Sequence, residues 1–209
     1  MSELSRWSLV AISLGARVYL LVLLTSYSKP QEFILLSDVL GLSLLVDSID
    51  HPKPPHSTEG TVFGPFHTHE AEPAPNGGII SHDPEGEACL VLCTVKDTSS
   101  KPVAGAKIDI WETDSRGFYD VQYADRDGPD GRAVMHSDEE GVFWFHAIVP
   151  VPYPIPHDGP VGALLKLLRR HPYRPSHMHF MFEKPGFDHL ITYVFDLHQP
   201  AASLSPNDC

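Results

Sequence analysis

The stretch GVFWFHAIV at residues 141–149 predicts a β-strand, entered through the turn sequence SDEEG at residues 137–141. In AKIDIW, polar and apolar residues alternate, which is typical of a strand with one buried face. The 209 residues include 15 glycines and 20 prolines. Both residues favour turns, so these numbers are typical of short strands joined by turns. The other predicted strands are CLVLCTV (89–95), AKIDIW (106–111), HMHFMF (177–182) and HLITYVF (189–195). Together they predict a mainly β protein, an antiparallel β-sandwich.

Two segments have helical patterns. Residues 30–50 (PQEFILLSDVLGLSLLVDSID) carry apolar side chains at steps of three and four, and the prolines of HPKPPH at residues 51–56 end the predicted helix. These side chains are Phe33, Leu36, Leu40 and Leu44. Residues 161–170 (VGALLKLLRR) predict a short amphipathic helix that stops at His171-Pro172. The sandwich is therefore expected to carry a helical N-terminal region.

The first 28 residues differ from the rest of the chain. Residues 8–24 are almost wholly apolar and contain one arginine, Arg17. A membrane-spanning helix needs about 20 apolar residues, and a central arginine costs ~2.5–3.5 kcal/mol. An anchor or signal, a helix packed on protein and an altered gene model are all consistent with this pattern. The expected division is an apolar segment 1–28, a helical segment 29–52 and a sandwich domain 53–209.

Composition excludes some classes of function. The apolar fraction of 42% is that of a globular protein, and the net charge of −12 argues against a nucleic-acid partner. A membrane is not expected as a partner either. Cys89 and Cys93 lie on one face of a predicted strand, too far apart for an easy disulfide. Reduced cysteines favour a cytoplasmic location.

The most suggestive motif for chemistry is RPSHMHF at residues 174–180. On a strand, His177 and His179 project from one face, while Met178 and Phe180 face the opposite side. Two imidazoles on a rigid face form half of a metal site. The alternative at this point is a pair of histidines that face solvent.

Three further strings are weaker alone. HTHE pairs His67 and His69 with Glu70, but its surroundings predict a loop, which positions ligands less firmly. In VPYPIPHDGP (151–160), prolines hold Tyr153 in extended backbone. GFYD contains Tyr119 at what is otherwise an aromatic strand end. Taken singly, both tyrosines are interpreted as packing residues.

In combination, these strings resemble the intradiol ring-cleavage dioxygenases, and most closely those that act on hydroxyquinol in fungi. The resemblance covers residues 29–197, with the family's motifs in the family's order. The matching stretches are QEFILLSDVLGLSLLVD (31–47), EGTVFGPFH (59–67), KPVAGAKIDIWETDSRGFYDVQY (101–123), PYPIPHDGPVGALL (152–165) and RHPYRPSHMHF (170–180).

The resemblance implies a site. Four side chains are expected to hold iron as Fe(3+): Tyr119, Tyr153, His177 and His179. Arg174 and Tyr153 are expected to act in catalysis. The implied substrate-binding residues are Leu35, Asp38, Val62, Phe63, Gly64, Pro65, Phe66, Ile155, Pro156 and Arg174.

The residue types suit the implied chemistry, because ferric iron is a hard cation that favours anionic oxygen ligands. The family cleaves hydroxyquinol or catechol with O₂ between the two hydroxyl-bearing carbons and forms a muconate-type diacid. Relatives form homodimers through a longer helical N-terminal region, and the resemblance implies that residues 29–52 are a shortened remnant of this dimerisation region. Here residues 1–28 and the tail DLHQPAASLSPNDC (196–209) depart from the family pattern. Tyr193 stands where catechol-type members often have glutamine.

Two other functions remain as alternatives. The altered ends are consistent with an inactive, truncated iron-binding remnant of the same fold. His177 and His179 are also consistent with a zinc-dependent hydrolase, although the strings lack an obvious third zinc ligand. Between substrates, residues 62–67 and 153–156 favour hydroxyquinol over catechol through the resemblance alone.

Overall fold

The computed structural model describes residues 32–195. Within that range the chain divides into two compact units, a larger one of residues 43–154 and 173–195 and a smaller one of residues 32–42 and 155–172. The apolar segment 1–28, with its alternative of a membrane anchor, lies outside the described residues. So does the tail 196–209, which departs from the family pattern. The predicted division at residues 28 and 52 stays a prediction.

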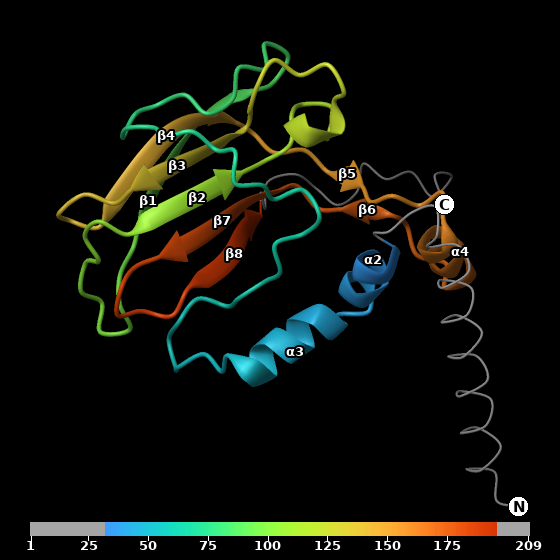
Figure 1. Ribbon diagram of the computed structural model, residues 1–209, viewed down its shortest axis with the longest axis horizontal. Helices are drawn as coiled ribbons and strands as arrows, with labels where there is room; N and C mark the ends of the chain where they lie inside the picture. The colour runs from blue at the N-terminus through green and yellow to red at the C-terminus, as the bar shows by residue number, and fades with distance from the viewer. Residues whose placement is uncertain (1–31, 196–209) are drawn as a thin grey trace, which may run out of the picture. The chain divides into compact units, whose positions relative to one another are not determined.

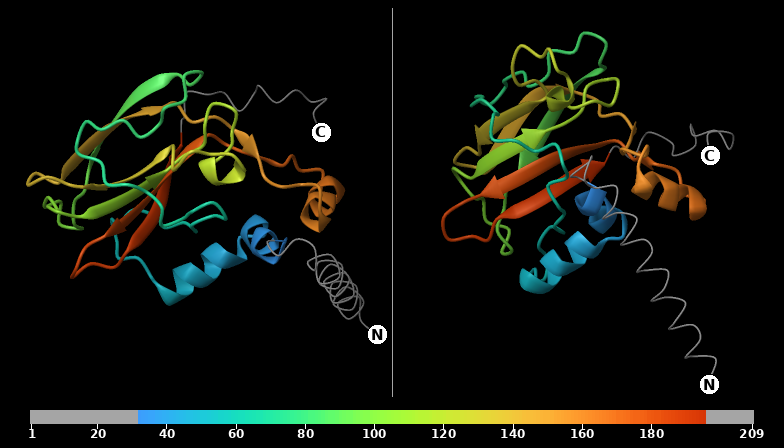
Figure 2. Two further views of the ribbon diagram at one scale, coloured as in Figure 1. Left: turned by 45° about the horizontal axis from the view of Figure 1, so that its top comes forward. Right: turned by 45° about the vertical axis from the view of Figure 1, so that its right-hand side comes forward.

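The larger unit is built from antiparallel sheets, as the sequence predicts (Figures 1 and 2). A four-stranded sheet has the order β3-β2-β7-β8, and β1 pairs with β4 in a second sheet. A short pair, β5 with β6, brings two further segments together. The strands are β1 (Ala88–Thr94), β2 (Lys107–Trp111), β3 (Arg132–His136), β4 (Val142–Ile148), β5 (Tyr153–Pro154), β6 (Tyr173–Arg174), β7 (His177–Glu183) and β8 (Leu190–Phe195).

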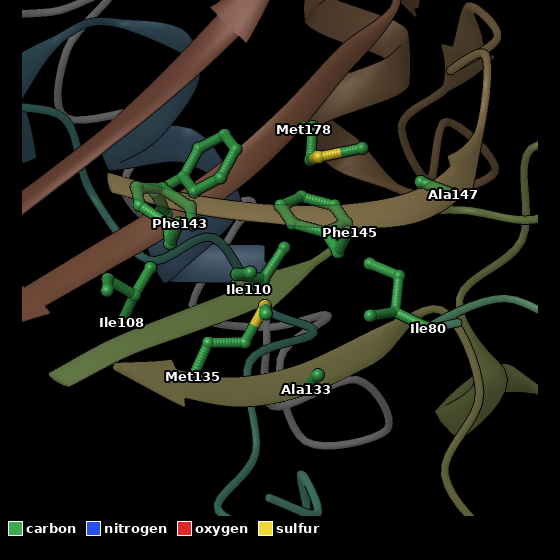
Figure 3. Packing of buried hydrophobic residues seen from close by; sticks show 10 residues of the cluster. Ile80, Ile108, Ile110, Ala133, Met135, Phe143, Phe145, Ala147 and Met178 are labelled. Atoms are coloured by element: carbon green, nitrogen blue, oxygen red, sulfur yellow. The ribbon is translucent and has the colours of Figure 1, made fainter. Parts of the chain in front are cut away.

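The core lies between the two main sheets. Figure 3 shows Phe143 and Phe145 of β4 beside Ile108 and Ile110 of β2, and all four side chains are fully buried. Burying one such side chain stabilises the fold by about 1.5–3 kcal/mol. Other members of this cluster are Ile80, Ala133, Met135, Ala147, Met178 and Phe180. Met178 and Phe180 therefore anchor β7 from the core side, as the alternation of its side chains predicts.

Two details of the sheet differ from expectation. Strand β3 was not predicted from the sequence. Its apolar stretch is only three residues long, and the polar Arg132 and His136 lie at its two ends. Strand β2 was expected to expose one face, but Asp109 on that face is only 4% exposed. His67 covers it, with Nε2 3.1 Å from Asp109 Oδ2. The strand is thus buried on both faces from Ile108 to Trp111.

Cys89 and Cys93 both lie on β1 and pack against the core, and no disulfide joins them. The prediction that they form no disulfide is confirmed.

The predicted helix over residues 30–50 is wrong as a single element. The segment forms α2 (Glu32–Val39) and α3 (Leu42–Asp50). Between them Gly41 has φ +71°, a left-handed conformation that favours glycine and ends a helix. Its amide donates to the carbonyl of Asp38 at 3.0 Å. Helix α3 stops before the proline-rich turn, as predicted.

The smaller unit contains α2 and α4 (Pro160–Leu167). Glu32 is 3% exposed, and its Oε2 accepts a hydrogen bond from the Val161 amide at 3.1 Å. A carboxylate at this end of α4 satisfies a free amide and complements the helix dipole. Helix α4 ends earlier than predicted, because Arg169 adopts a left-handed conformation with φ +54°.

None of the helices in residues 32–195 is long and apolar enough to span a membrane.

Candidate metal centre

Two histidines of β7 form one side of a buried cluster, on the face of the sheet opposite the core. Because the strand is extended, His177 and His179 project to the same side. Their Nε2 atoms lie 3.2 Å apart, and each residue is 1% exposed. The alternative of solvent-facing histidines is therefore wrong.

The two imidazoles are oriented by different means. His177 Nδ1 lies 2.7 Å from the Pro175 carbonyl oxygen, so Nδ1 carries the hydrogen and Nε2 presents its lone pair. The His179 ring stacks on the Trp111 indole, with centroids 4.8 Å apart and 2° between the planes. Among the described residues, His179 Nδ1 has no hydrogen-bond partner. A hydrogen bond thus fixes one ring and an aromatic stack fixes the other.

Two tyrosines reach the cluster from irregular segments. Tyr119 precedes the short 3-10 helix η1 (Asp120–Gln122), and Tyr153 begins β5. Their hydroxyl oxygens lie 3.3 Å apart, and both residues are buried. The Tyr153 ring centroid is 5.4 Å from that of His177. The structure therefore brings together the four side chains that the resemblance selects.

The two tyrosine segments approach each other closely at Gly117. This residue has φ +80°, and a Cβ placed on it would lie 2.8 Å from the Cβ of Tyr153. A larger residue would push the two segments apart. Glycine at this position is therefore needed for the tyrosines to meet.

Arg174 places a permanent positive charge beside the tyrosines. It pairs with Tyr153 across the β5-β6 ladder, and its Nη1 donates to the Tyr153 hydroxyl oxygen at 2.8 Å. Arg174 lies where the sequence analysis expects a catalytic arginine.

Burial controls the charge states in the metal-free protein. It lowers the pKa of His177 to about 4, with the Arg174 charge acting in the same direction and the bond to Pro175 opposing both. Burial, His177 and Arg174 hold the pKa of His179 well below its usual value. Burial and the neighbouring Tyr153 raise the pKa of Tyr119 well above its usual value. Both imidazoles are therefore neutral at pH 7, and Tyr119 is a phenol.

This donor set fits a ferric ion. Neutral imidazole nitrogens are the form that binds metals, and the Nε2 lone pair of His177 is directed into the cluster. Phenol oxygens become hard anionic ligands only when a strong positive charge displaces their protons. Two nitrogen and two oxygen donors in one buried place match a hard trivalent cation better than they match Zn²⁺, whose usual ligands are Cys, His, Asp and Glu.

A loop of predicted substrate-binding residues lies over the cluster. Phe66 stacks on Tyr119 with ring centroids 4.8 Å apart, and Phe63 stacks on Trp111 at 6.3 Å. Gly64 has φ +70°, and a Cβ on it would lie 3.9 Å from His179 Nε2. Val62 and Pro65 are neighbours in the same half-buried loop. The loop therefore presents aromatic rings and bare backbone to the metal-ligand candidates.

The remaining predicted substrate residues belong to the smaller unit. They are Leu35 and Asp38 on α2 and, in the segment before α4, Ile155 and Pro156. Their part in substrate binding stays a prediction.

Comparison with known proteins identifies the family. A family model described as "Dioxygenase" matches residues 60–200, and one described as "Catechol dioxygenase N terminus" matches residues 18–58. The intradiol ring-cleavage dioxygenase hqdA of Aspergillus niger is 76% identical over 170 residues, which cover 81% of this chain and 52% of that protein. The chain belongs to the intradiol ring-cleavage dioxygenase family.

Two hydroxyquinol 1,2-dioxygenases are also similar to this chain. A hydroxyquinol 1,2-dioxygenase of Rhizobium is 49% identical, over 81% of this chain and 58% of that protein. The crystal structure of hydroxyquinol 1,2-dioxygenase from Pseudomonas putida has a TM-score of 0.81 and 39% identity, and the match covers 93% of this chain and 66% of that one. The chain thus spans between about half and two thirds of these relatives' lengths. Intradiol dioxygenases use non-haem iron.

The second histidine string, HTHE at residues 67–70, has a structural role in this chain. His67 is held by Asp109 and contacts the Trp111 indole edge-on at 4.6 Å. His69 and Glu70 are exposed. Within residues 32–195 no three side chains of the His, Cys, Asp and Glu types are placed to hold a metal ion. In the described part of the chain, therefore, the HTHE string forms no metal site, and there is no zinc site of the usual ligands.

Three contributors to the candidate metal centre were not predicted from the sequence. Trp111 supports His179, the Asp109–His67 pair supports Trp111, and Arg132 binds the loop beside Tyr119. Trp111 lies opposite His179 in the β2-β7 register, so strand pairing would have indicated it. The Arg132 contacts join segments about 65 residues apart in sequence, and no local pattern indicates them.

Proposed function

We propose that this chain is a ferric-iron dioxygenase that opens the ring of hydroxyquinol between its adjacent hydroxyl-bearing carbons. This proposal rests on the buried cluster of two imidazole nitrogens and two phenol oxygens, in which Arg174 donates a hydrogen bond to one of the phenol oxygens. The substrate follows from relatives named for hydroxyquinol at 45–49% identity. One O₂ is consumed per ring, and each new carboxyl group of the 3-hydroxymuconate product gains one oxygen atom.

Tyr119, Tyr153, His177 and His179 would hold the iron, which when bound supplies Lewis acidity toward the diol oxygens and a redox centre. Tyr153 Oη is the proposed acceptor of a substrate hydroxyl proton. Arg174 donates to this oxygen and holds its charge in place until the proton arrives. The guanidinium then stabilises negative charge on the deprotonated ring, as a fixed electrostatic group does best in a buried site.

The aromatic loop suits a flat substrate. Phe63 is 38% exposed and lies beside the buried Trp111, so an aromatic ring added there gains stacking contacts. Phe66 closes the side next to Tyr119. These side chains orient a planar diol and exclude water from it.

Oxygen uptake by the full chain, loaded with ferric iron, tests the function. We expect one O₂ consumed per hydroxyquinol, slower uptake with catechol, and none in Tyr119→Phe. Faster uptake with catechol would assign that substrate instead, which the 41% identity to a catechol 1,2-dioxygenase of Candida albicans also allows. A coloured, iron-loaded protein that consumes no O₂ with either diol would overturn the proposal in favour of an inactive remnant.

We also propose that the chain forms a homodimer and acts in the cytoplasm. Helix α3 supports the first part, since it exposes Leu45, Val46 and Ile49 by more than half of their surface. Analytical ultracentrifugation of the full chain measures the oligomeric state, and fractionation of the cells measures the location.

A further inference from the structure

Arg132, a buried arginine at the first position of β3, bonds to more than the loop beside Tyr119. The Arg132 side chain is 1% exposed. A fully buried guanidinium is stable only when its donors find acceptors. The acceptors of Arg132 lie on two different loops, and each loop contributes an aromatic residue to the metal centre.

The first loop carries Tyr119. Arg132 Nε donates to Asp120 Oδ2 at 2.8 Å, and Nη2 donates to Asp120 Oδ1. The two bonds form a fork that fixes the direction of the carboxylate. Asp120 directly follows Tyr119, and its Oδ1 also accepts from the Val121 amide at 2.8 Å. The fork therefore holds the backbone on the C-terminal side of Tyr119.

The second loop carries Phe66. Arg132 Nη1 donates to Thr68 Oγ1 at 2.9 Å, and Nη2 lies 3.4 Å from the Phe66 carbonyl oxygen as a longer bond. The Phe66 ring stacks on the Tyr119 ring with 24° between the planes. One guanidinium thus joins the backbones of two residues whose rings are in contact.

We propose that Arg132 is a positioning residue for the metal centre, acting through Asp120 and the Phe66 loop to set where the Tyr119 hydroxyl lies. This inference rests on the proposed function, because it assigns Tyr119 as a ligand. It goes beyond the ligands and Arg174, and it predicts that iron binding depends on a residue with no atom in the cluster.

Lysine cannot replace arginine in this role. An ammonium is a point charge on a flexible stem, whereas the guanidinium is a planar fork with donors in fixed directions. Arg132→Lys keeps the charge opposite Asp120, so the buried pair stays neutral overall and the fold is retained. It loses the simultaneous reach to Asp120, Thr68 and Phe66.

Arg126 provides a matched control. Its Nη1 donates to the same Asp120 Oδ2 at 3.1 Å, but its side chain is 26% exposed and its other partner is Glu70, on the surface. Within residues 32–195, the Arg126 side chain bonds to Asp120 and Glu70 and to neither Phe66 nor Thr68. Arg126→Lys therefore changes a contact to Asp120 and leaves the link between the loops intact.

The experiment compares wild type, Arg132→Lys and Arg126→Lys as full chains. In the metal-free proteins, hydrogen–deuterium exchange is measured over residues 66–68 and 118–123. After ferric loading, iron affinity and the tyrosinate-to-iron charge-transfer band are measured. We expect faster exchange in both segments, a shifted band and about tenfold weaker iron binding in Arg132→Lys, with wild-type values in Arg126→Lys.

The outcomes separate the two proposals. A colourless iron-loaded wild type would refute the proposed function, whatever the exchange shows. A coloured wild type with an unchanged band, affinity and exchange in Arg132→Lys would overturn the inference alone. If Arg132→Lys does not fold, Thr68→Val removes one acceptor without disturbing the charge pair. A shifted band in Thr68→Val supports the inference, and a wild-type band refutes it.

Discussion

The two halves of the candidate metal centre are held in opposite ways. His177 and His179 stand on a strand between two others, so the pleat sets their spacing and the core packs behind them. Tyr119 and Tyr153 stand on irregular segments that other side chains must hold in place. A regular element fixes position through backbone pairing, whereas a loop needs a dedicated set of contacts. The predictions below probe this difference, in order of decreasing effect on the site.

Removal of a histidine has the largest expected effect. His177→Ala or His179→Ala deletes a nitrogen donor that nothing on the rigid strand can replace. Iron affinity should fall by more than the roughly 10–100-fold that changes around a ligand cause, as measured by competition with a chelator. His146→Ala, on the exposed face of β4, should bind iron normally. Retained iron binding in His179→Ala would show that the strand half is not a ligand pair.

Removal of a tyrosine hydroxyl should be nearly as severe. Tyr153→Phe deletes an oxygen donor and leaves Arg174 Nη1 without this acceptor, so we expect about 100-fold weaker iron binding and an altered charge-transfer band. The control is Tyr123→Phe, which removes a hydroxyl bonded to Asp114 on the neighbouring loop. A Tyr153→Phe protein with the wild-type spectrum would exclude Tyr153 as a ligand.

Arg174→Met should separate catalysis from metal binding. The variant loses the donor to the Tyr153 oxygen but no ligand atom, so kcat should fall about 100-fold while iron still binds. Steady-state oxygen uptake gives kcat and KM, and Arg170→Met, an exposed arginine, serves as the reference. If KM rises and kcat does not change, Arg174 holds the substrate only in its ground state.

Trp111→Phe tests the stack that orients His179. A smaller ring leaves part of the imidazole unsupported, so iron affinity should fall about tenfold and stability by roughly 2 kcal/mol. Urea unfolding and chelator competition measure the two effects. Trp144→Phe, at a tryptophan 36% exposed on the outer face of β4, should change neither by as much. Equal effects in the two variants would mean that the stack has no orienting role.

Glu112 should affect stability and leave the site unchanged. Burial raises its pKa from 4.5 to about 8, so the folded protein keeps a proton that the unfolded chain releases above pH 4.5. Stability from this group is complete below pH 4.5 and falls as the pH rises toward 8, by on the order of 3 kcal/mol at pH 7.

Glu112→Gln should therefore be more stable than wild type at pH 7 and have a flatter stability profile between pH 5 and 8. Urea unfolding at several pH values measures this, with the exposed Glu140→Gln as the reference. A profile as steep as that of wild type would place the titrating group elsewhere. Iron affinity should be unchanged, because Glu112 bonds to Ile148 of β4 on the core side.

The contrast between strand and loop also explains what the sequence could predict. The strand period placed His177 and His179 on one face and Met178 in the core, and the structure confirms both. The same period says nothing of Tyr119 and Tyr153, which only the resemblance to the family selected. The spacing of apolar side chains around Leu36 and Leu40 predicted one continuous helix. That spacing carries no information about the backbone conformation at Gly41, where the helix is interrupted.

Contacts between segments distant in sequence could not be predicted from local residue patterns, for a physical reason. Asp109 alternates with apolar neighbours as a solvent-facing residue does, and only the covering His67 makes it a buried one. The partners of Arg132 depend on the way two loops fold toward β3. Such positions depend on tertiary packing, which no local spacing encodes.

The stack of Phe66 on Tyr119 has a consequence for anyone who engineers the proposed activity of this chain. Phe66 borders the expected substrate space and at the same time supports a metal-ligand candidate. Trimming Phe66 to admit bulkier diols would therefore weaken cofactor retention along with substrate discrimination. Directed evolution toward a wider substrate range should accumulate compensating changes in the Thr68 loop before it gains turnover.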